Sequence, residues 1–194
     1  MPSMSAVEQS FCRSPLWAGF ARKTVLTWAL QGVRPVGELL ELGSGSGAMA
    51  AGTAKTFPGL RLMVSDIDPA MVRAARKRLR GHPGVTVTEA DVTDLPFEDA
   101  RFDVVASYLM LHHVIDWQQA LAEAVRVLKP GGTIVGYDLD RTRAAEWVHI
   151  LDRSPYRLIE HDELAPALAE AGFEQVRVRR AWGGLVTRFV GQRA

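Results

Sequence analysis

Short apolar runs alternate with amphipathic stretches along the chain. Each run covers four to six residues and is typical of a buried strand, whereas the amphipathic stretches repeat apolar residues every three or four positions, as helices do. This alternation predicts a doubly wound α/β fold, in which helices cover both faces of a mostly parallel sheet. Strands are expected at residues 39–42, 60–64, 85–88, 102–107, 133–137, 175–178 and 185–190, and helices at 48–57, 69–80, 117–128 and 164–171.

Residues that cap helices mark the ends of several elements. An N-terminal helix is expected to begin at Ser14, which precedes a proline, and to end near Gly32. Asp116 lies three residues before a glutamine and has the pattern of a capping box for the helix that follows it. Asp162 and Gly172 are expected to cap the start and the end of the last helix.

The composition is that of one globular domain. Of the 194 residues, 47% are hydrophobic and 23% are charged, and the net charge of +1 gives no overall reason to expect nucleic acid or an anionic membrane as partner. Cys12 is the only cysteine and can form neither an internal disulfide nor a cysteine zinc site, which suits a reducing, cytoplasmic location. No signal peptide is expected, because residues 1–10 are polar and lack a basic start followed by an apolar core. No transmembrane segment is expected, because Arg22 and Lys23 interrupt the most apolar early stretch.

The segment "ELGSGSG", residues 41–47, places three glycines directly after an expected strand. Glycines at such a turn let the backbone approach a ligand closely, and ligands of parallel sheets bind beyond the carboxyl ends of the strands. The spacing GxGxG fits the dinucleotide fingerprint GxGxxG only loosely, so a nicotinamide cofactor remains an alternative. Glu41 favours another ligand, because a carboxylate is a poor neighbour for a pyrophosphate and a good one for a cation.

Further carboxylates follow the next two strands. Asp66 lies twenty-three residues after Gly43, where an acid can accept both hydroxyls of a ribose. Asp68 precedes a proline and is interpreted as a helix cap. Asp91 and Val92 follow the third strand, where an acceptor and an apolar surface can hold an adenine. Carboxylates around a glycine loop indicate a positively charged nucleoside without phosphates, such as S-adenosylmethionine.

Four segments, in order, resemble the motifs of a known family. They are "ELGSGSG", "VSDIDPAMVRAARKRL", "EADVTDLPFEDARFDVVASYLMLHHV" and "VLKPGG", and they look like class I S-adenosylmethionine-dependent methyltransferases of type 11, a subgroup of small-molecule and quinone-type enzymes. The resemblance covers residues 36–140 and implies a seven-stranded sheet of order 3-2-1-4-5-7-6 with the last strand antiparallel. It also implies one domain with an N-terminal helical cap at 1–35 and a short insertion with the C-terminal strands at 141–194.

The resemblance also implies which residues hold the cofactor. The methionine part of the cofactor is expected at the end of the first strand and at the glycine loop, with Ser107 on the same side. The ribose is expected at the second strand, and the adenine at the second and third strands. The corresponding residues are Glu41, Gly43, Ser44, Gly45 and Gly47 for the methionine part, Asp66 for the ribose, and Ile67, Asp91 and Val92 for the adenine.

A fixed catalytic residue is not required for methyl transfer. The sulfonium is already a good leaving group, so in-line displacement mainly needs an aligned acceptor in a dry pocket, and a base helps only if the acceptor must lose a proton. His112 and His113, just after the fourth strand, are candidate bases. The alternative is structural, with one histidine packed under the sheet and the other capping the helix at Asp116. Tyr108 is a weaker candidate and more typical of a pocket wall.

Several absences narrow the acceptor. The sequence "SYLM" stands where enzymes that methylate amino groups of nucleic-acid bases have (D/N)PPY, and no cysteine lies in that region, so no nucleic-acid acceptor is expected. Ser107 stands where metal-dependent catechol enzymes have a carboxylate. Asp138 and Asp140 lack a third ligand and are interpreted as loop caps, so no metal is expected. A small-molecule acceptor remains.

Several alternatives to this interpretation exist. A protein that binds S-adenosylmethionine or S-adenosylhomocysteine without catalysis would carry the same motifs, and a nicotinamide-dependent reductase is disfavoured because no Tyr-x-x-x-Lys pair is present. The insertion after the fifth strand is short, which leaves the pocket open for a homodimer contact or for a large acceptor. Trp17, Phe20 and Trp28 form either the core stripe of the first helix or a lid for a lipophilic acceptor.

Overall fold

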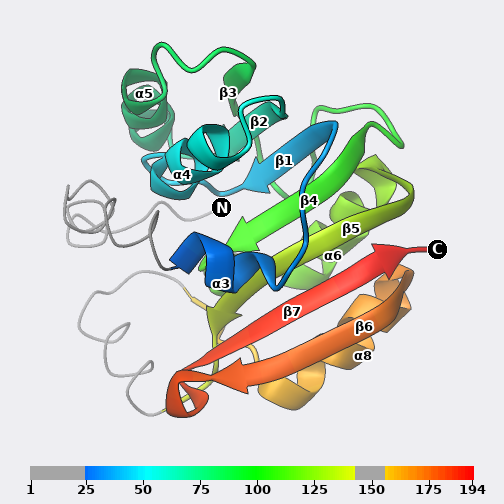
Figure 1. Ribbon diagram of the computed structural model, residues 1–194. Helices are drawn as coiled ribbons and strands as arrows, with labels where there is room; N and C mark the ends of the chain where they lie inside the picture. Colours follow the sequence, from blue (N-terminus) through cyan, green and yellow to red (C-terminus); the bar gives the residue numbers. More distant parts are fainter. Residues whose placement is uncertain (1–24, 143–155) are drawn as a thin grey trace.

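The computed structural model describes residues 25–142 and 156–194, and these form one seven-stranded sheet flanked by helices (Figure 1). The strand order is β3-β2-β1-β4-β5-β7-β6, and β7 is antiparallel to both of its neighbours. The expected fold and strand order are therefore confirmed. The strands are β1 (Glu38–Leu42), β2 (Arg61–Asp66), β3 (Val85–Glu89), β4 (Phe102–Tyr108), β5 (Leu128–Leu139), β6 (Phe173–Ala181) and β7 (Val186–Arg193).

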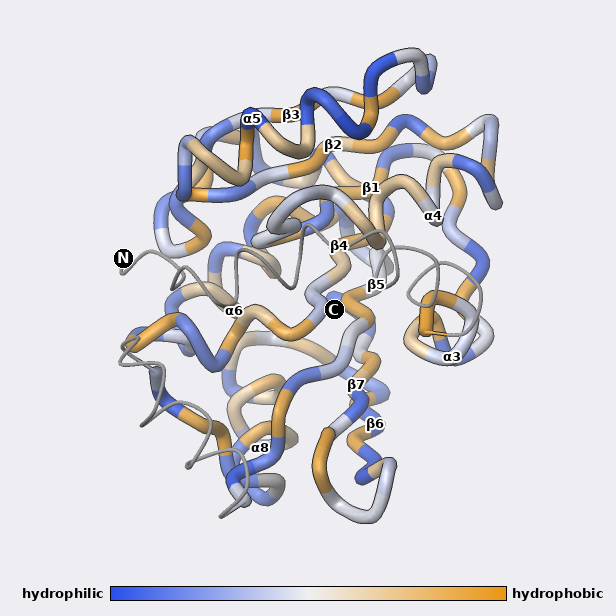
Figure 2. The backbone as a smooth tube through the Cα atoms, turned by 90° about the vertical axis from the view of Figure 1, so that its left-hand side faces the viewer, coloured by the Kyte–Doolittle hydropathy of each residue, from blue (hydrophilic) through white to orange (hydrophobic). Residues whose placement is uncertain are grey.

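Helices cover the two faces of the sheet in separate layers. Figures 1 and 2 place α3 and α4 on one side, and α6 and α8 on the other. Each face has its own apolar cluster, and α5 contributes to the cluster on the α3 side. The described helices are α3 (Leu26–Leu30), α4 (Ala48–Thr56), α5 (Pro69–Arg78), α6 (Trp117–Val127) and α8 (His161–Ala171), with short 3-10 turns η2 (Leu111–His113) and η3 (Trp182–Gly184).

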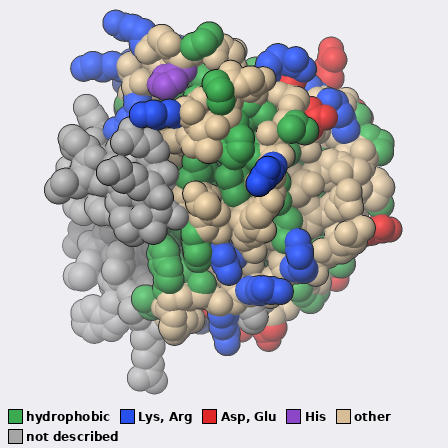
Figure 3. All heavy atoms as spheres, in the orientation of Figure 1, with side chains coloured by type: hydrophobic (Ala, Val, Ile, Leu, Met, Phe, Trp, Pro, Cys, Tyr) green, Lys and Arg blue, Asp and Glu red, His purple; other side chains and the backbone are tan. Residues whose placement is uncertain are grey.

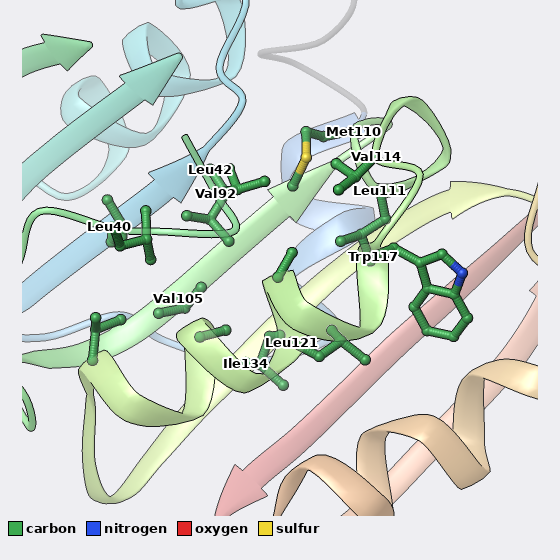
Figure 4. Close-up of a cluster of buried hydrophobic side chains, with 14 of the residues drawn as sticks. Leu40, Leu42, Val92, Val105, Met110, Leu111, Val114, Trp117, Leu121 and Ile134 are labelled. Atoms are coloured by element: carbon green, nitrogen blue, oxygen red, sulfur yellow. The ribbon is translucent and has the colours of Figure 1, made fainter. Parts of the chain in front are cut away.

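The larger cluster joins α6 to the sheet and to the segment that follows β4. Trp117 and Leu121, both about 1% exposed, belong to this cluster, and Leu121 lies close to Ile134 of β5 (Figure 4). Met110 and Val114 belong to the same cluster. Burial of such side chains contributes about 25 cal/mol for each Å² removed from water, so this packing holds the segment after β4 against the core.

Parallel register brings the carboxyl ends of the central strands to one edge. Leu42 of β1 lies opposite Ser107 of β4, and Glu41 lies opposite Val64 of β2. Tyr108 of β4 lies opposite Tyr137 of β5. The loops that follow β1, β2 and β4 therefore start from neighbouring points, as expected for the ligand-binding edge of a doubly wound sheet.

Several predicted boundaries were wrong. β5 begins at Leu128 instead of residue 133, because the Lys-Pro-Gly-Gly segment continues the strand after α6. Asp162 is not the cap of the last helix. Glu160 is the N-cap, and its capping box with Glu163 starts α8 one residue after it. The predicted end of this helix at Gly172 is confirmed by its left-handed conformation, with φ of 108°.

Two other caps were predicted correctly. Asp68 accepts a hydrogen bond from the N–H of Ala70 at 2.7 Å and begins α5. Asp116 accepts one from the N–H of Gln119 at 3.3 Å and begins α6. Gln119 donates its own side-chain amide to another residue, the carbonyl of Thr93, so only half of the predicted capping box is present.

The first described helix, α3, lies against β5. Its predicted start at Ser14 and the aromatic residues Trp17 and Phe20 lie outside the described residues. The helix ends with Gln31 in the left-handed conformation, one residue before the predicted stop. Trp28 packs edge-on against Tyr137 of β5, with ring centroids 5.2 Å apart, which supports its interpretation as a core residue. Within the described parts of the chain, no helix is long and apolar enough to cross a membrane.

Candidate functional site

The glycine loop between β1 and α4 has three left-handed residues in five. Gly43, Gly45 and Gly47 have φ of 55°, 55° and 75°. A Cβ on Gly43 would collide with the side chain of Met110, and one on Gly47 would lie 3.1 Å from Leu79 of the α5 region. A Cβ on Gly45 would meet nothing within 4 Å. The outer glycines therefore allow close packing within the protein, whereas the middle one leaves open space beside the backbone.

Asp66 ties the end of β2 to this loop. Its Oδ2 accepts a hydrogen bond from the N–H of Gly45 at 2.7 Å, and its Oδ1 accepts one from the N–H of Asp68 at 2.9 Å. The side chain is 7% exposed. Burial raises the pKa of the carboxyl above its ordinary value, although the two N–H groups partly offset this. The carboxylate thus braces the glycine loop, and each of its oxygens keeps acceptor capacity for a ligand.

Glu41 is buried beside the loop without a charged partner. It is the fourth residue of β1 and is 1% exposed. Its Oε2 accepts no hydrogen bond from residues 25–142 or 156–194. Burial raises the pKa of Glu41 from 4.5 to about 8, and the N–H of Ala50 in α4 lowers it only in part. An ionised carboxyl that is buried without a charged partner lowers the stability of the ligand-free protein, so this position favours a cationic ligand.

Three hydroxyl groups near the ends of β1 and β4 also lack partners. The buried oxygens of Ser44, Ser107 and Tyr108 make no hydrogen bond with any residue that the structure describes. Burial first, and then the charge of Glu41, raise the pKa of Tyr108 well above its usual value, so Tyr108 keeps its proton and suits a pocket wall better than a base. Proteins leave few buried polar groups unsatisfied, and four of them at one strand edge indicate a polar ligand.

The residues expected around the adenine follow β2 and β3. The backbone N–H of Ala90 donates to the carbonyl of Asp66 at 3.0 Å, which places Asp91 next to the end of β2. Asp91 Oδ1 accepts hydrogen bonds from the N–H and the hydroxyl of Thr93, at 2.9 and 2.7 Å. Ile67 is half-buried, and Val92 is 3% exposed within the cluster under α6. Asp91 and Ile67 are thus available at this edge, and Val92 is mainly a core residue.

His112 forms an acid–base pair that the sequence did not reveal. Its Nδ1 makes a short hydrogen bond with Oδ1 of Asp138, and both side chains are buried. Burial would raise the pKa of Asp138, but the charge and hydrogen bond of His112 outweigh it and hold the pKa below its usual value. Asp138 Oδ2 also accepts hydrogen bonds from the N–H groups of Met110 and Leu111, at 3.2 and 2.7 Å. The prediction that Asp138 caps a loop was therefore correct but incomplete.

The other sequence candidates lie around this pair. The ring of His113 is half-buried, with its centroid 4.0 Å from that of His112. Neither histidine caps α6, because Asp116 does so itself. Asp140 Oδ2 accepts from Arg180 at 2.7 Å and from Thr187 at 3.2 Å, whereas its buried Oδ1 accepts no hydrogen bond from the described residues. Among the residues that the structure describes, no group of three His, Cys, Asp or Glu side chains could hold a metal ion.

Comparisons with known proteins agree with this geometry. Residues 40–136 match the family described as "Methyltransferase domain". The chain is similar to a demethylmenaquinone methyltransferase of Clavibacter sepedonicus, at 33% identity over 173 residues that cover 76% of this chain and 70% of the relative. It is also similar to a ubiquinone/menaquinone biosynthesis C-methyltransferase of Ectopseudomonas mendocina, at 28% identity over 200 residues that cover 88% and 76% of the two chains.

A solved structure shows the same fold. It is an S-adenosylmethionine-dependent methyltransferase of Thermotoga maritima, described as a possible histamine N-methyltransferase, with a TM-score of 0.75, 25% identity and 92% of each chain covered. The strand order, the glycine loop after β1 and the family match identify the same kind of protein. The chain belongs to the methyltransferase-domain family of class I S-adenosylmethionine-dependent methyltransferases.

Proposed function

We propose that this enzyme methylates an acidic carbon or hydroxyl of a small ring-containing acceptor, with the cofactor held along the ends of β1, β2, β3 and β4. The observation that carries this proposal is the group of buried, unpartnered polar atoms of Glu41, Ser44, Ser107 and Tyr108 beside the glycine loop. A ligand with an ammonium, a sulfonium and several polar groups satisfies them without any change in the fold.

Glu41 and the glycine loop suit the amino-acid end of the cofactor. The ionised carboxylate of Glu41 would pair with the ammonium group in a site without bulk water, where such a pair is strong. The N–H groups at the start of α4, a helix of nine residues, can donate hydrogen bonds to a carboxylate. Ser44 and Ser107 supply hydroxyls on the same side.

Asp66, Ile67 and Asp91 suit the nucleoside end. Asp66 follows β2 and can accept the ribose hydroxyls while it keeps its bond to Gly45. Ile67 offers an apolar surface to one side of the adenine, and the half-buried Asp91 offers an acceptor to its amino group. Val92, which packs in the core, supports the adenine site from behind.

When bound, S-adenosylmethionine supplies an electrophilic methyl group on a good leaving group. His112 is placed to remove a proton from the acceptor, because Asp138 binds Nδ1 and thereby directs Nε2 as the proton acceptor. In balance, the acceptor loses its proton to His112, its carbon or oxygen forms a bond to the methyl group, and the electron pair of the breaking C–S bond stays on sulfur. The buried surroundings of Asp138 exclude water from this step.

The named relatives support a ring carbon as the methylated atom. Two of them are described as methyltransferases of quinone biosynthesis, one of them as a C-methyltransferase. A hydroquinone ring becomes nucleophilic at carbon when its hydroxyl loses a proton, which is the step that a His–Asp pair assists. The aromatic side chains of Tyr108 and Tyr137, with centroids 5.8 Å apart, offer flat apolar surfaces at the end of β4 and β5.

One experiment separates catalysis from binding alone. Purified protein is titrated calorimetrically with S-adenosylmethionine and with NAD, and is then incubated with methyl-labelled cofactor and a water-soluble demethylmenaquinol analogue. We expect binding of S-adenosylmethionine but not of NAD, and label in the ring methyl group of the product. Binding without transfer to any phenol, quinol or enolisable carbonyl compound would instead support a non-catalytic binding protein.

A further inference from the structure

The face of β6 and β7 on the α3 side carries unpaired arginines in spite of the low net charge. Arg177 and Arg179 are exposed on β6 and form no ion pair with the described residues. Arg179 lies directly opposite Arg188 of β7. Like charges in directly opposed positions destabilise a sheet, so this arrangement costs the folded protein stability that a ligand of opposite charge would return. Figure 3 shows Lys and Arg side chains gathered over this part of the sheet.

An exposed apolar tip adjoins these arginines. The turn between β6 and β7 presents Trp182 and Leu185, which are 49% and 47% exposed. Trp182 stacks on Trp28 with ring centroids 4.6 Å apart and an interplanar angle of 15°. The guanidinium of Arg188 lies over the other ring of this stack, 4.8 Å from the centroid of Trp28. Tryptophan beside arginine is the combination found where proteins meet lipid headgroups.

The tip lies at the same edge of the sheet as the cofactor site. Val186, the first residue of β7, pairs with Leu139 at the carboxyl end of β5. From Trp182, ring contacts pass through Trp28 to Tyr137 and then to Tyr108. A continuous row of aromatic side chains therefore joins the exposed turn to the end of β4. Figure 1 shows the β6–β7 turn beyond the end of β5.

We propose that the β6–β7 hairpin binds the surface of an anionic phospholipid bilayer, with Trp182 and Leu185 inserted among the headgroups and Arg177 and Arg179 paired with lipid phosphates. Charge complementarity selects this partner, because unopposed arginines and an apolar tip together match a negative surface with an apolar interior. Such docking places the proposed active site at the membrane surface, beside the bilayer in which an apolar acceptor is dissolved. That consequence rests on the proposed function, whereas the docking itself does not.

Sedimentation with vesicles tests the docking without cofactor or acceptor. The protein is mixed with vesicles of phosphatidylcholine alone, or of phosphatidylcholine and phosphatidylglycerol in equal amounts. We expect binding to the anionic vesicles that weakens with added salt, and little binding to the neutral ones. The double variant R177E/R179E should bind at least about tenfold more weakly, since each basic residue near such a surface contributes about 1 kcal/mol. Trp182→Ala should weaken binding without changing its salt dependence.

The matched control reverses the same amount of charge elsewhere. Arg73 and Lys77 are exposed on α5, and R73E/K77E has the same net charge as R177E/R179E. We expect this control to keep most of the vesicle binding. Circular dichroism and titration with S-adenosylmethionine establish that each variant is folded, and the latter also tests the proposed function separately. Equal losses in both double variants, or no binding of the wild type to anionic vesicles, would overturn the proposal.

Two other occupants give distinct results. If the face binds nucleic acid, a random oligonucleotide displaces the protein from vesicles and Trp182→Ala leaves that binding unchanged. If the face joins a second copy of the chain, light scattering shows a dimer that Trp182→Ala dissociates, and anionic vesicles bind no protein. Either result contradicts membrane docking.

Discussion

Asp66 Oδ2 accepts a hydrogen bond of 2.7 Å from the backbone N–H of Gly45. This bond joins the end of β2 to the one glycine of the loop that faces open space. The same carboxylate therefore holds the loop in its left-handed conformation and lies beside the open space next to Gly45. In the proposed function, stability and cofactor binding both depend on this residue.

Asp66→Ala should lose both functions. Its removal leaves the N–H of Gly45 without a partner, which costs about 1–3 kcal/mol of stability, and removes charge-assisted hydrogen bonds of about 1.5–3 kcal/mol each from the ribose. We expect a lower melting temperature and a dissociation constant for S-adenosylmethionine raised at least about tenfold. Asp94→Ala, at an exposed position, is the control. An unchanged dissociation constant would refute the assignment of Asp66 to the ribose.

Glu41 should make the ligand-free protein less stable as pH rises. Its folded pKa of about 8 lies above its ordinary value of 4.5, so the folded protein holds a proton that the unfolded chain releases. The contribution to stability is complete below 4.5 and is lost as pH rises through 8, by up to about 1.4 kcal/mol per pH unit. Urea unfolding at a series of pH values should show this decline, and Glu41→Gln should abolish that part of it.

Cofactor binding should release a proton from Glu41. At neutral pH the buried carboxyl is mostly protonated, and a cationic ligand stabilises its ionised form. Calorimetric titrations in buffers of different ionisation enthalpy should therefore give different apparent enthalpies near pH 7. The difference should be absent in Glu41→Gln, which we also expect to bind more weakly. Identical apparent enthalpies in all buffers would show that Glu41 does not ionise on binding.

His112→Gln should slow methyl transfer without affecting cofactor affinity. Removal of a general base lowers turnover by about a hundredfold or more. Glutamine keeps a polar group beside Asp138, and titration with S-adenosylmethionine checks that the site is intact. His113→Gln is the matched control and should keep most of the activity. If both variants turn over like the wild type, the pair of His112 and Asp138 is structural.

Asp138→Glu tests whether Asp138 acts by positioning His112. The longer carboxylate preserves the charge but shifts it relative to Nδ1. We expect a lower kcat, an altered pH profile of kcat and a nearly unchanged KM for the cofactor. Asp138→Asn should be more damaging, because it also weakens the bonds to the N–H groups of Met110 and Leu111. A loss of stability with an unaltered pH profile in Asp138→Glu would indicate a purely structural residue.

The periodic pattern of the sequence was sufficient for the alternation of strands and helices and for the glycine loop, because both depend on local signals. The strand order was expected only from the family resemblance, because it depends on which distant strands pair. The ends of helices and strands were harder to predict where two local structures compete for the same residues. Leu128 was expected to end the preceding helix, with the Pro-Gly-Gly at 130–132 as its stop, yet pairing of Leu128 with Phe102 extends β5 through these residues. The cap of α8 moved to Glu160 because its reciprocal bond with Glu163 satisfies two backbone N–H groups, whereas Asp162 would satisfy fewer.

The pair of His112 and Asp138 could not be read from spacing alone. The residues are 26 positions apart and meet only because β4 and β5 are neighbours in parallel register. A signal was nonetheless present, because His112 follows β4 and Asp138 lies near the end of β5, and these two strands are neighbours. The roles of Glu41 and Ser107 in the proposal likewise gained support only when their burial without partners was known.

Because β7 runs antiparallel to its neighbours, the β6–β7 turn lies at the same edge of the sheet as the proposed cofactor site. The first strands, β1 and β2, carry residues proposed to hold the cofactor, while the turn η3 (Trp182–Gly184) reaches this edge from the other end of the chain. Under the proposed docking, a change in this hairpin is expected to alter which surface the protein binds without altering the residues proposed to hold the methyl donor.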